Sequence, residues 1–387
     1  MISNKMSGIR EAATITMNQK AADLQKRGIK VYNFGIGEPD QTTPTNIIES
    51  AFDYARSGKT HYTPSDGIPE LREKIAVKMK QKNNIDASPS NIVVTPTKYA
   101  LFMTAMCILN TGEKVVIPEP YWVSYPYMVK LSGGIPQFLE TKANYEFDGD
   151  LLRKRLGETG VKALILNNPL NPSGKVYSEK SLRKLVDIIL EYRGIYLISD
   201  EIYEDLIYTG KMFSPASIPE MAERTVTISG FSKSYAMTGW RIGYLTGPME
   251  LMKAVSMMQQ HTITCAPSIS QYAALAALDD NETPIRLRNT FLERRDLVID
   301  LLSQSELLSF YKPEGTFYIF PSYDLKIDSV QFSTGLLESK HVIVTPGSAF
   351  GGKGEFHFRI SYATSTDTIR EGIPKINEYV KSLKSGS

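Results

Sequence analysis

One lysine in this chain lies in a setting that could make its amine a nucleophile. Ser232, Lys233 and Ser234 follow the apolar run 225–228, and Arg241 comes eight positions after Lys233. In water a lysine amine has a pKa near about 10.4 and is usually a solvated cation. A cofactor with a carbonyl group would use such an amine, while nearby hydroxyls and Arg241 could hold a phosphate on the same molecule. The segment therefore predicts a phosphate-bearing cofactor bound through Lys233.

Length and composition are those of an ordinary globular protein larger than one hydrophobic core. The chain has 387 residues, of which 42% are apolar and 22% charged, with a formal charge of +2. We therefore expect a large domain plus a smaller one. Because the net charge is close to zero, we expect no strongly basic surface that would bind nucleic acid or a membrane. Small molecules are therefore the expected partners.

Targeting and metal-binding signals are weak. The N-terminus lacks the apolar core of a signal peptide, and no run of roughly twenty apolar residues occurs, which predicts a cytoplasmic protein. The two cysteines and four scattered histidines show neither a disulfide framework nor metal-ligand spacing, so we expect no metal site.

Short apolar runs alternate with helical patterns through the first two thirds of the chain. The β-rich runs are 92–95, 114–117, 162–167, 195–199 and 225–228, and the helical patterns include 99–110, 179–192 and 249–261. This alternation predicts an α/β fold with a mostly parallel sheet between layers of helices. Ligands of such sheets gather at the carboxyl ends of the strands, where Asp200 and Asn171 fall. From about residue 286 the pattern changes to a charged helix and further short runs, which predicts a smaller α+β domain.

Three motifs together resemble a known family. The stretch from Ser232 to Gly243 reads SKSYAMTGWRIG, residues 35–39 read GIGEP, and residues 358–362 read FRISY. This pattern resembles that of class I aminotransferases, fold type I enzymes that use pyridoxal 5′-phosphate, and in particular the prokaryotic aspartate and aromatic subgroup. The resemblance spans nearly the whole chain. It implies a large cofactor-binding domain over 43–285, a small domain over 286–387, and an N-terminal segment 1–42, including 11–28, that joins the small domain.

The resemblance assigns roles around the cofactor ring. Lys233 would form the covalent bond to the cofactor and Asp200 would face the pyridine nitrogen, so that the ring can accept electrons. Tyr203 and Asn171 would contact the 3′ oxygen, and Trp122 would stack on the ring.

The phosphate would lie at the start of the helix 99–110. Thr97 and Lys98 would offer backbone amides there, because the N-terminal end of a helix favours anions. Pro96 departs from the glycine that the family usually has and lacks an N–H donor.

Further phosphate contacts would come from the lysine motif and from a second chain. Arg241 would give a paired contact, and the hydroxyl would come from Ser232 or Ser229, since Gly230 stands where relatives often have serine. Tyr62 matches a tyrosine that reaches the phosphate of the neighbouring subunit. The resemblance thus implies a homodimer with shared active sites.

The substrate's α-carboxylate would be held by Arg359, whose planar donors match a carboxylate in two-point fashion, with Asn171, Gly37 and Trp122 beside it. The implied reaction is ping-pong transfer of an α-amino group to a 2-oxo acid such as 2-oxoglutarate.

The expected amino donor is aspartate or an aromatic amino acid. Lys98 could contact a distal carboxylate of aspartate, whereas Tyr99 could line a pocket for an aromatic side chain. Two alternatives stay open, namely another fold type I activity (kynurenine aminotransferase or cysteine-conjugate β-lyase) and a non-catalytic regulator that binds the cofactor.

Overall fold

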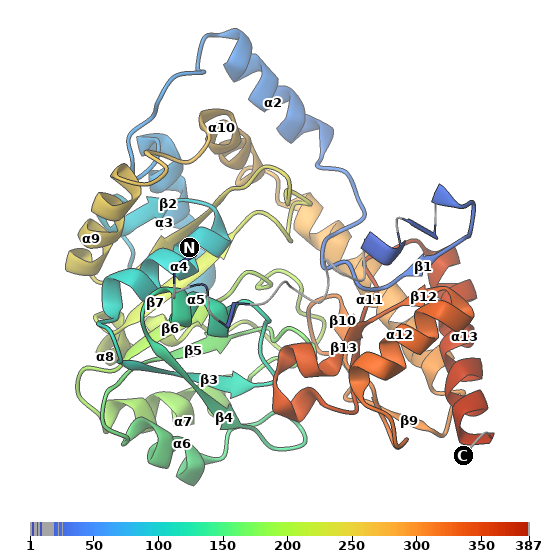
Figure 1. Cartoon of the computed structure of the whole chain (residues 1–387). Coiled ribbons are helices and arrows are strands. Elements are labelled where there is room, and N and C mark those ends of the chain that lie inside the picture. Colours follow the sequence, from blue (N-terminus) through green and yellow to red (C-terminus); the bar gives the residue numbers. More distant parts are fainter. Residues whose placement is uncertain are drawn as a thin grey trace.

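A central sheet with helices on both faces forms the larger part of the molecule (Figure 1). The computed structural model describes residues 2, 3, 6, 8, 9, 19–21, 23, 24 and 26–385. Within these, seven strands pair in the order β2-β8-β7-β6-β5-β3-β4, and β8 alone runs antiparallel to its neighbours. The strands are β2 (Ile92–Val94), β3 (Lys114–Glu119), β4 (Ile135–Glu140), β5 (Val161–Asn167), β6 (Tyr196–Asp200), β7 (Thr225–Gly230) and β8 (Gly243–Thr246).

The continuous apolar runs arise because both faces of this sheet are covered. Ile165 and Ile198 pack under one helical layer, while their neighbours Leu164 and Leu197 pack under the other. The first layer contains α4 (Thr97–Ile108), α5 (Tyr125–Leu131) and α9 (Met249–Gln260), and the second contains α6 (Gly149–Leu156), α7 (Glu179–Leu190) and α8 (Pro219–Ala222). The predicted α/β class with a mostly parallel sheet is confirmed.

Two strands of the sheet were missed by the sequence pattern. β4 is an edge strand that carries Pro136 and is largely accessible, so it lacks the continuous apolar run of a buried strand. β8 is a short strand at the end of the lysine motif itself. It returns antiparallel to β7, so the residues between them form a loop, which we call the lysine loop (residues 231–242).

A third apolar cluster covers the β2 edge of the sheet. Ile92, Val94 and Tyr244 pack there against helices far apart in the sequence. These are α2 (Thr45–Arg56), α3 (Pro69–Asn83) and α10 (Ser268–Ala277).

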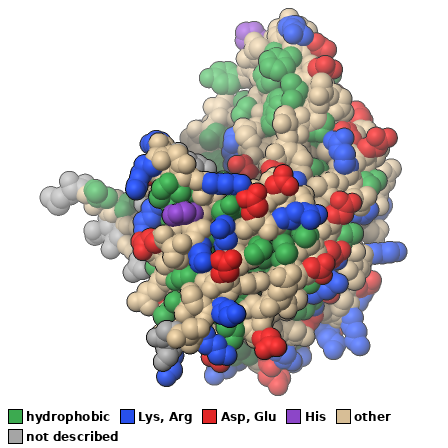
Figure 2. Space-filling model, turned by 90° about the vertical axis from the view of Figure 1, so that its right-hand side faces the viewer, with side chains coloured by type: hydrophobic (Ala, Val, Ile, Leu, Met, Phe, Trp, Pro, Cys, Tyr) green, Lys and Arg blue, Asp and Glu red, His purple; other side chains and the backbone are tan. Residues whose placement is uncertain are grey.

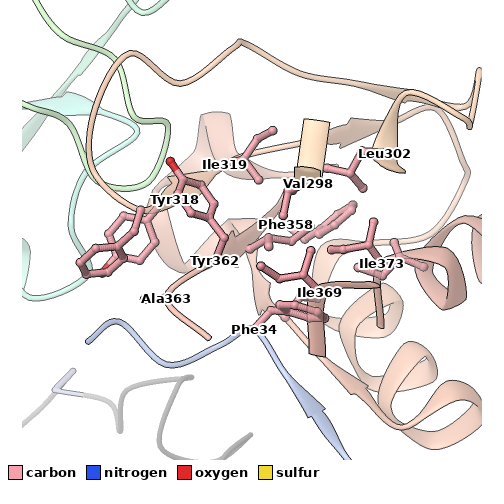
Figure 3. Packing of buried hydrophobic residues seen from close by; sticks show 14 of the residues in the cluster. Phe34, Val298, Leu302, Tyr318, Ile319, Phe358, Tyr362, Ala363, Ile369 and Ile373 are labelled. Carbon is pink, nitrogen blue, oxygen red and sulfur yellow. The ribbon is translucent and has the colours of Figure 1, made fainter. Parts of the chain in front are cut away.

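The C-terminal part has its own core, to which the N-terminal segment contributes. Phe34 lies with Phe358, Ile369 and Ile373 in one buried cluster (Figure 3). Its helices are α11 (Glu282–Leu302), α12 (Ser329–Lys340) and α13 (Thr366–Ser385), and its strands are β1 (Tyr32–Asn33), β9 (Leu308–Ser309), β10 (Tyr318–Ile319), β11 (Ser322–Tyr323), β12 (Val342–Ile343), β13 (Thr345–Pro346) and β14 (Phe358–Ser361).

β1 pairs in parallel with β12, which joins the two ends of the chain. Of the stretch 11–28 that the resemblance places on this part, residues 11–18, 22 and 25 lie outside the described residues. Ala21 packs against Leu337 and Ile343.

Surface charges are mixed. On the face shown in Figure 2, basic and acidic side chains are interspersed. None of the helices in the described part of the chain is both long and apolar enough to span a membrane.

The start of α7 offers a test of local stability. The Ser178 hydroxyl accepts the hydrogen bond of the Ser181 amide and so caps the helix. Ser178→Ala should lower the free energy of unfolding by about 1 kcal/mol, whereas Ser178→Asp, which keeps an acceptor, should not. Urea denaturation at equal cofactor loading measures both variants, and equal loss in the two would contradict the capping role.

Candidate active site

A cavity of about 460 Å³ opens where strand ends, the start of α4 and the C-terminal part meet. Asn167 ends β5 and Asp200 ends β6, while Lys233 lies on the lysine loop after β7. Because these parallel strands end at the same edge of the sheet, their terminal side chains converge there.

The cavity brings together eleven of the twelve residues predicted from the sequence. These are Gly37, Thr97, Lys98, Trp122, Asn171, Asp200, Tyr203, Ser232, Lys233, Arg241 and Arg359. Tyr62 does not line the cavity of this chain, and its side chain is 87% exposed.

The amine of Lys233 is enclosed but faces the cavity. Its Nζ donates to the carbonyl oxygen of Gly37 at 2.7 Å. Gly37 has to be glycine in this arrangement, since a Cβ there would lie 2.5 Å from the Tyr318 hydroxyl. Burial lowers the pKa of Lys233 to about 8, with Arg359 and Arg241 acting in the same direction and Glu38 and Asp200 against it. About a tenth of the amine is therefore neutral at pH 7 and about half at pH 8, and this neutral form is the one that a nucleophile or base requires.

Asp200 is a buried carboxylate with two hydrogen-bond donors. Its Oδ2 accepts from the Tyr125 hydroxyl at 2.6 Å and its Oδ1 from the Ile202 amide at 3.3 Å. Burial raises the pKa of Asp200 to about 6, while these donors and Lys233 oppose the rise. The carboxylate is thus mostly ionised at neutral pH and can attract a cation inside the cavity.

The start of α4, where it lines the cavity, is suited to a phosphate-sized anion. Thr97 and Lys98 are the first residues of α4, whose leading amides have no acceptor within the helix. Arg241 and Ser232 line the same cavity, and Arg241 also donates to the Thr238 carbonyl at 2.7 Å.

The geometry distinguishes the two serines that the sequence left open. Ser232 lines the cavity, whereas the Ser229 hydroxyl donates to Glu204 at 2.5 Å and is buried away from it. Gly230 packs tightly beside them, because a Cβ there would lie 2.6 Å from the Thr97 hydroxyl oxygen. The glycine in place of serine thus allows β7 to lie against the start of α4.

The cavity lining also includes a buried arginine. Arg359 on β14 donates to the Asn171 side-chain oxygen at 3.1 Å and to the Gly35 carbonyl at 3.0 Å. Its guanidinium lies 4.3 Å from the Tyr318 ring centroid. Asn171 is itself held, since its backbone N–H donates to the side-chain oxygen of Asn167 at 2.8 Å. A guanidinium fixed in this way suits a carboxylate.

Aromatic side chains form the cavity walls. The Lys98 amine lies 4.8 Å from the Trp122 ring, and burial together with Arg241 lowers the pKa of Lys98. The Tyr203 hydroxyl hydrogen-bonds the Tyr318 hydroxyl at 3.1 Å. Lys98, Lys233, Arg241 and Arg359 outnumber the acidic groups Asp200 and Glu38 among the lining residues, which favours anionic ligands.

Sequence reasoning missed some of the residues that shape this cavity. Tyr125 and Tyr318 were given no role from the sequence, and only the fold brings them to Asp200 and Arg359. Glu38, which accepts from the Thr238 hydroxyl at 2.7 Å, lay within the GIGEP motif but was given no role. Trp240 of the lysine loop packs in the third cluster and donates to the Thr43 hydroxyl at 2.9 Å, which is a structural role.

Fold and cavity together define an α/β enzyme with an enclosed lysine, and comparison with known proteins identifies its family. The family described as Aminotransferase class I and II matches residues 29–376. A probable aspartate/prephenate aminotransferase of Aquifex aeolicus (strain VF5) is 40% identical over 394 residues, covering 99% of both chains. The aspartate aminotransferase of Bacillus subtilis (strain 168) is 38% identical, over 98% of this chain and 99% of the relative. The structure of the Thermus thermophilus aspartate aminotransferase with maleate superimposes with a TM-score of 0.93 at 36% identity, over 98% of this chain and 99% of the other.

The chain belongs to the class I and II aminotransferase family. It is a pyridoxal-phosphate-dependent aminotransferase with the type I fold, as the motifs predicted, and it acts on amino acids.

The lowered pKa of Lys233 has a direct chemical consequence. In the cofactor-free protein, the rate of reductive methylation of Lys233 should rise with pH. The midpoint of this rise should lie near pH 8, because the amine loses its proton there. Solvated lysine amines have a pKa near about 10.4, so the methylation of solvent-exposed lysines as a class should rise only at higher pH. Peptide mass spectrometry across a pH series measures both, and a shared midpoint would contradict the effect of burial.

Proposed function

We propose that this aminotransferase moves the α-amino group of aspartate or an aromatic amino acid to a 2-oxo acid such as 2-oxoglutarate by a ping-pong mechanism. The set of cations carries the proposal: Arg359 lines the cavity from β14, Lys98 from α4 and Arg241 from the lysine loop. Such a cavity can hold a phosphate and the carboxylates of an amino acid together. The names of relatives that include aspartate and prephenate support the same substrate class.

The donor set fits pyridoxal phosphate. The phosphate would be held by Thr97 and Lys98 at the start of α4, with Ser232 and Arg241. Asp200 would face the ring nitrogen, Trp122 would cover the ring, and Tyr203 and Asn171 would contact its 3′ oxygen. When bound, the cofactor supplies the aldehyde that takes up the amino group and a ring that accepts electrons.

The protein's own contribution is to hold the reactants and to move one proton. Arg359 and Asn171, with Trp122 and the Gly37 backbone nearby, would fix the α-carboxylate of the substrate and so orient its Cα–H bond. Lys233, largely neutral above pH 8, would remove the proton from the substrate Cα and deliver it to the cofactor carbon within the same half-reaction. Asp200, ionised above pH 6, would keep the ring nitrogen protonated.

Lys98 is our candidate for recognition of a distal carboxylate. Its amine lies over Trp122 within the cavity, where a second acidic group of the substrate could reach it. The Thermus thermophilus structure with maleate, a dicarboxylate, supports a preference for two acidic groups. Tyr99, the alternative for aromatic substrates, lies next to it on α4 and packs against Phe102.

We also propose a homodimer with shared active sites. The strong exposure of Tyr62 supports this, because a side chain that does not line its own cavity is available to the cavity of a second copy.

The division into an N-terminal segment 1–42, a large domain 43–285 and a small domain 286–387 remains our proposal as well. The pairing of β1 with β12 supports the assignment of the N-terminal segment, and the second boundary falls in the first turn of α11, which begins at Glu282.

The enzyme class leaves other fold type I activities as the alternative. A kynurenine aminotransferase or cysteine-conjugate β-lyase would share these lining residues but would not need Lys98 to bind a distal carboxylate. Spectral conversion of the bound cofactor by aspartate, phenylalanine, tyrosine, kynurenine and alanine, with 2-oxo acid products identified by chromatography, tests the proposal. Pyruvate and ammonia from a cysteine conjugate, without turnover of aspartate, would contradict it.

Lys98→Ala should lower the ratio of aspartate to phenylalanine turnover by at least about tenfold, because only aspartate loses a partner for its second carboxylate. Any loss of phosphate contact lowers both activities and leaves the ratio unchanged. The exposed Lys130→Ala on α5 serves as the control. An unchanged kcat/KM ratio in the Lys98 variant would remove Lys98 from substrate recognition.

A further inference from the structure

The hydrogen bond between Tyr125 and Asp200 lies outside the roles assigned above. Both side chains are buried, with 2% and 3% of their surfaces exposed, and the two oxygen atoms are 2.6 Å apart. Tyr125 is the first residue of α5, on one face of the sheet, whereas Asp200 ends β6 in the centre of the sheet. The contact therefore ties a covering helix to the strand end that faces the cavity.

The ring of Tyr125 makes a second contact at the same site. It meets the Trp122 ring edge-on, with centroids 5.3 Å apart and planes at 81°. One side chain thus touches both the aromatic wall of the cavity and its buried carboxylate. The two contacts are separable, because phenylalanine would keep the ring contact and lose the hydroxyl.

The charge state of Asp200 depends on few groups. Tyr125 faces it from α5, Lys233 from the lysine loop and Tyr203 from the turn after β6, together with the Ile202 amide. Burial raises the pKa of Tyr125 well above its usual value, so its hydroxyl keeps its proton and donates. The Tyr203 hydroxyl hydrogen-bonds Tyr318 instead, which leaves Tyr125 as the side-chain donor to Asp200 in the described residues.

We propose that Tyr125 is a positioning residue for amino-group transfer, whose hydroxyl fixes Oδ2 of Asp200 and orients the carboxylate toward the cofactor's ring nitrogen. The proposal rests on the role proposed for Asp200 above. A donor to a carboxylate stabilises its charged form, so Tyr125 also offsets part of the burial that raises the pKa of Asp200 to about 6.

Tyr125→Phe tests this in the cofactor-free chain. The pKa of Asp200, followed by NMR of protein with ¹³C-labelled aspartate carboxyls and assigned with Asp200→Asn, should rise by about one to two units. Half or more of the carboxyl groups would then be protonated near neutral pH. An Asp200 midpoint within about 0.3 units of the parent value would overturn the proposal.

The same variant should show a matching change in cofactor affinity. The dissociation constant for pyridoxal phosphate, measured by fluorescence between pH 5.5 and 8.5, should rise as the pH falls. The midpoint of this rise should lie at a higher pH in Tyr125→Phe than in the parent protein, by the same amount as the midpoint of the NMR titration. Tyr127→Phe, a half-buried tyrosine on the same helix, is the matched control and should leave both midpoints unchanged. A loss of thermal stability in Tyr125→Phe with unshifted midpoints would assign Tyr125 a merely structural role and overturn the proposal.

A double-variant cycle separates this inference from the proposed function. In an Asp200→Asn background, adding Tyr125→Phe should change cofactor affinity far less than it does alone, because the charged acceptor is gone. Equal effects in both backgrounds would overturn the role of Tyr125. If Asp200→Asn itself left affinity and turnover unaltered, the role proposed for Asp200 would fail instead.

Discussion

The active site depends on confining a lysine amine in a cavity that already contains other cations. Removing an ammonium group from water disfavours its charged form, and Arg359 and Arg241 add to that effect at Lys233. Glu38 and Asp200 oppose it, and the Gly37 carbonyl gives the amine a hydrogen-bond acceptor. The balance leaves a nucleophile that is available near neutral pH while the cavity still attracts anions. Cofactor phosphate and substrate carboxylates are bound by the same positive charge that makes the lysine reactive.

A buried polar network supports the strand ends that carry this chemistry. Glu204 accepts hydrogen bonds from Lys78 and Asn83 of α3 and from Ser229 of β7. Burial acts to raise the pKa of Glu204, but Lys78 and Lys82 outweigh it and hold the pKa low. Glu201, the neighbour of Asp200, accepts from the hydroxyls of Ser199 and Ser214. Because every one of these groups is partnered, the network can fix α3 relative to β6 and β7.

The sequence predicted those parts of the molecule that local pattern encodes. Runs such as 162–167 and 225–228 became β5 and β7 because strands buried on both faces are continuously apolar. The edge strand β4 and the short strand β8 were not predicted, because pairing with neighbouring strands, and not apolar composition, defines them. Lining residues within motifs, such as Lys233 and Arg359, were predicted by resemblance. Tyr125 and Tyr318 were not, because their importance arises from contacts between elements distant in the chain.

The pairing of β1 with β12 bears on how the chain folds as it is made. Tyr32 and Phe34 receive their backbone acceptors from His341 and Ile343, which the ribosome adds late. Until then the apolar residues of the N-terminal segment have no strand beside them, although the large sheet, which ends at β8, can already form. Gly37 reaches Lys233 from this same segment. The cavity wall is therefore completed only after residues 341–343 have been synthesised, and a nascent chain stalled before residue 340 would carry the lysine loop without its cover.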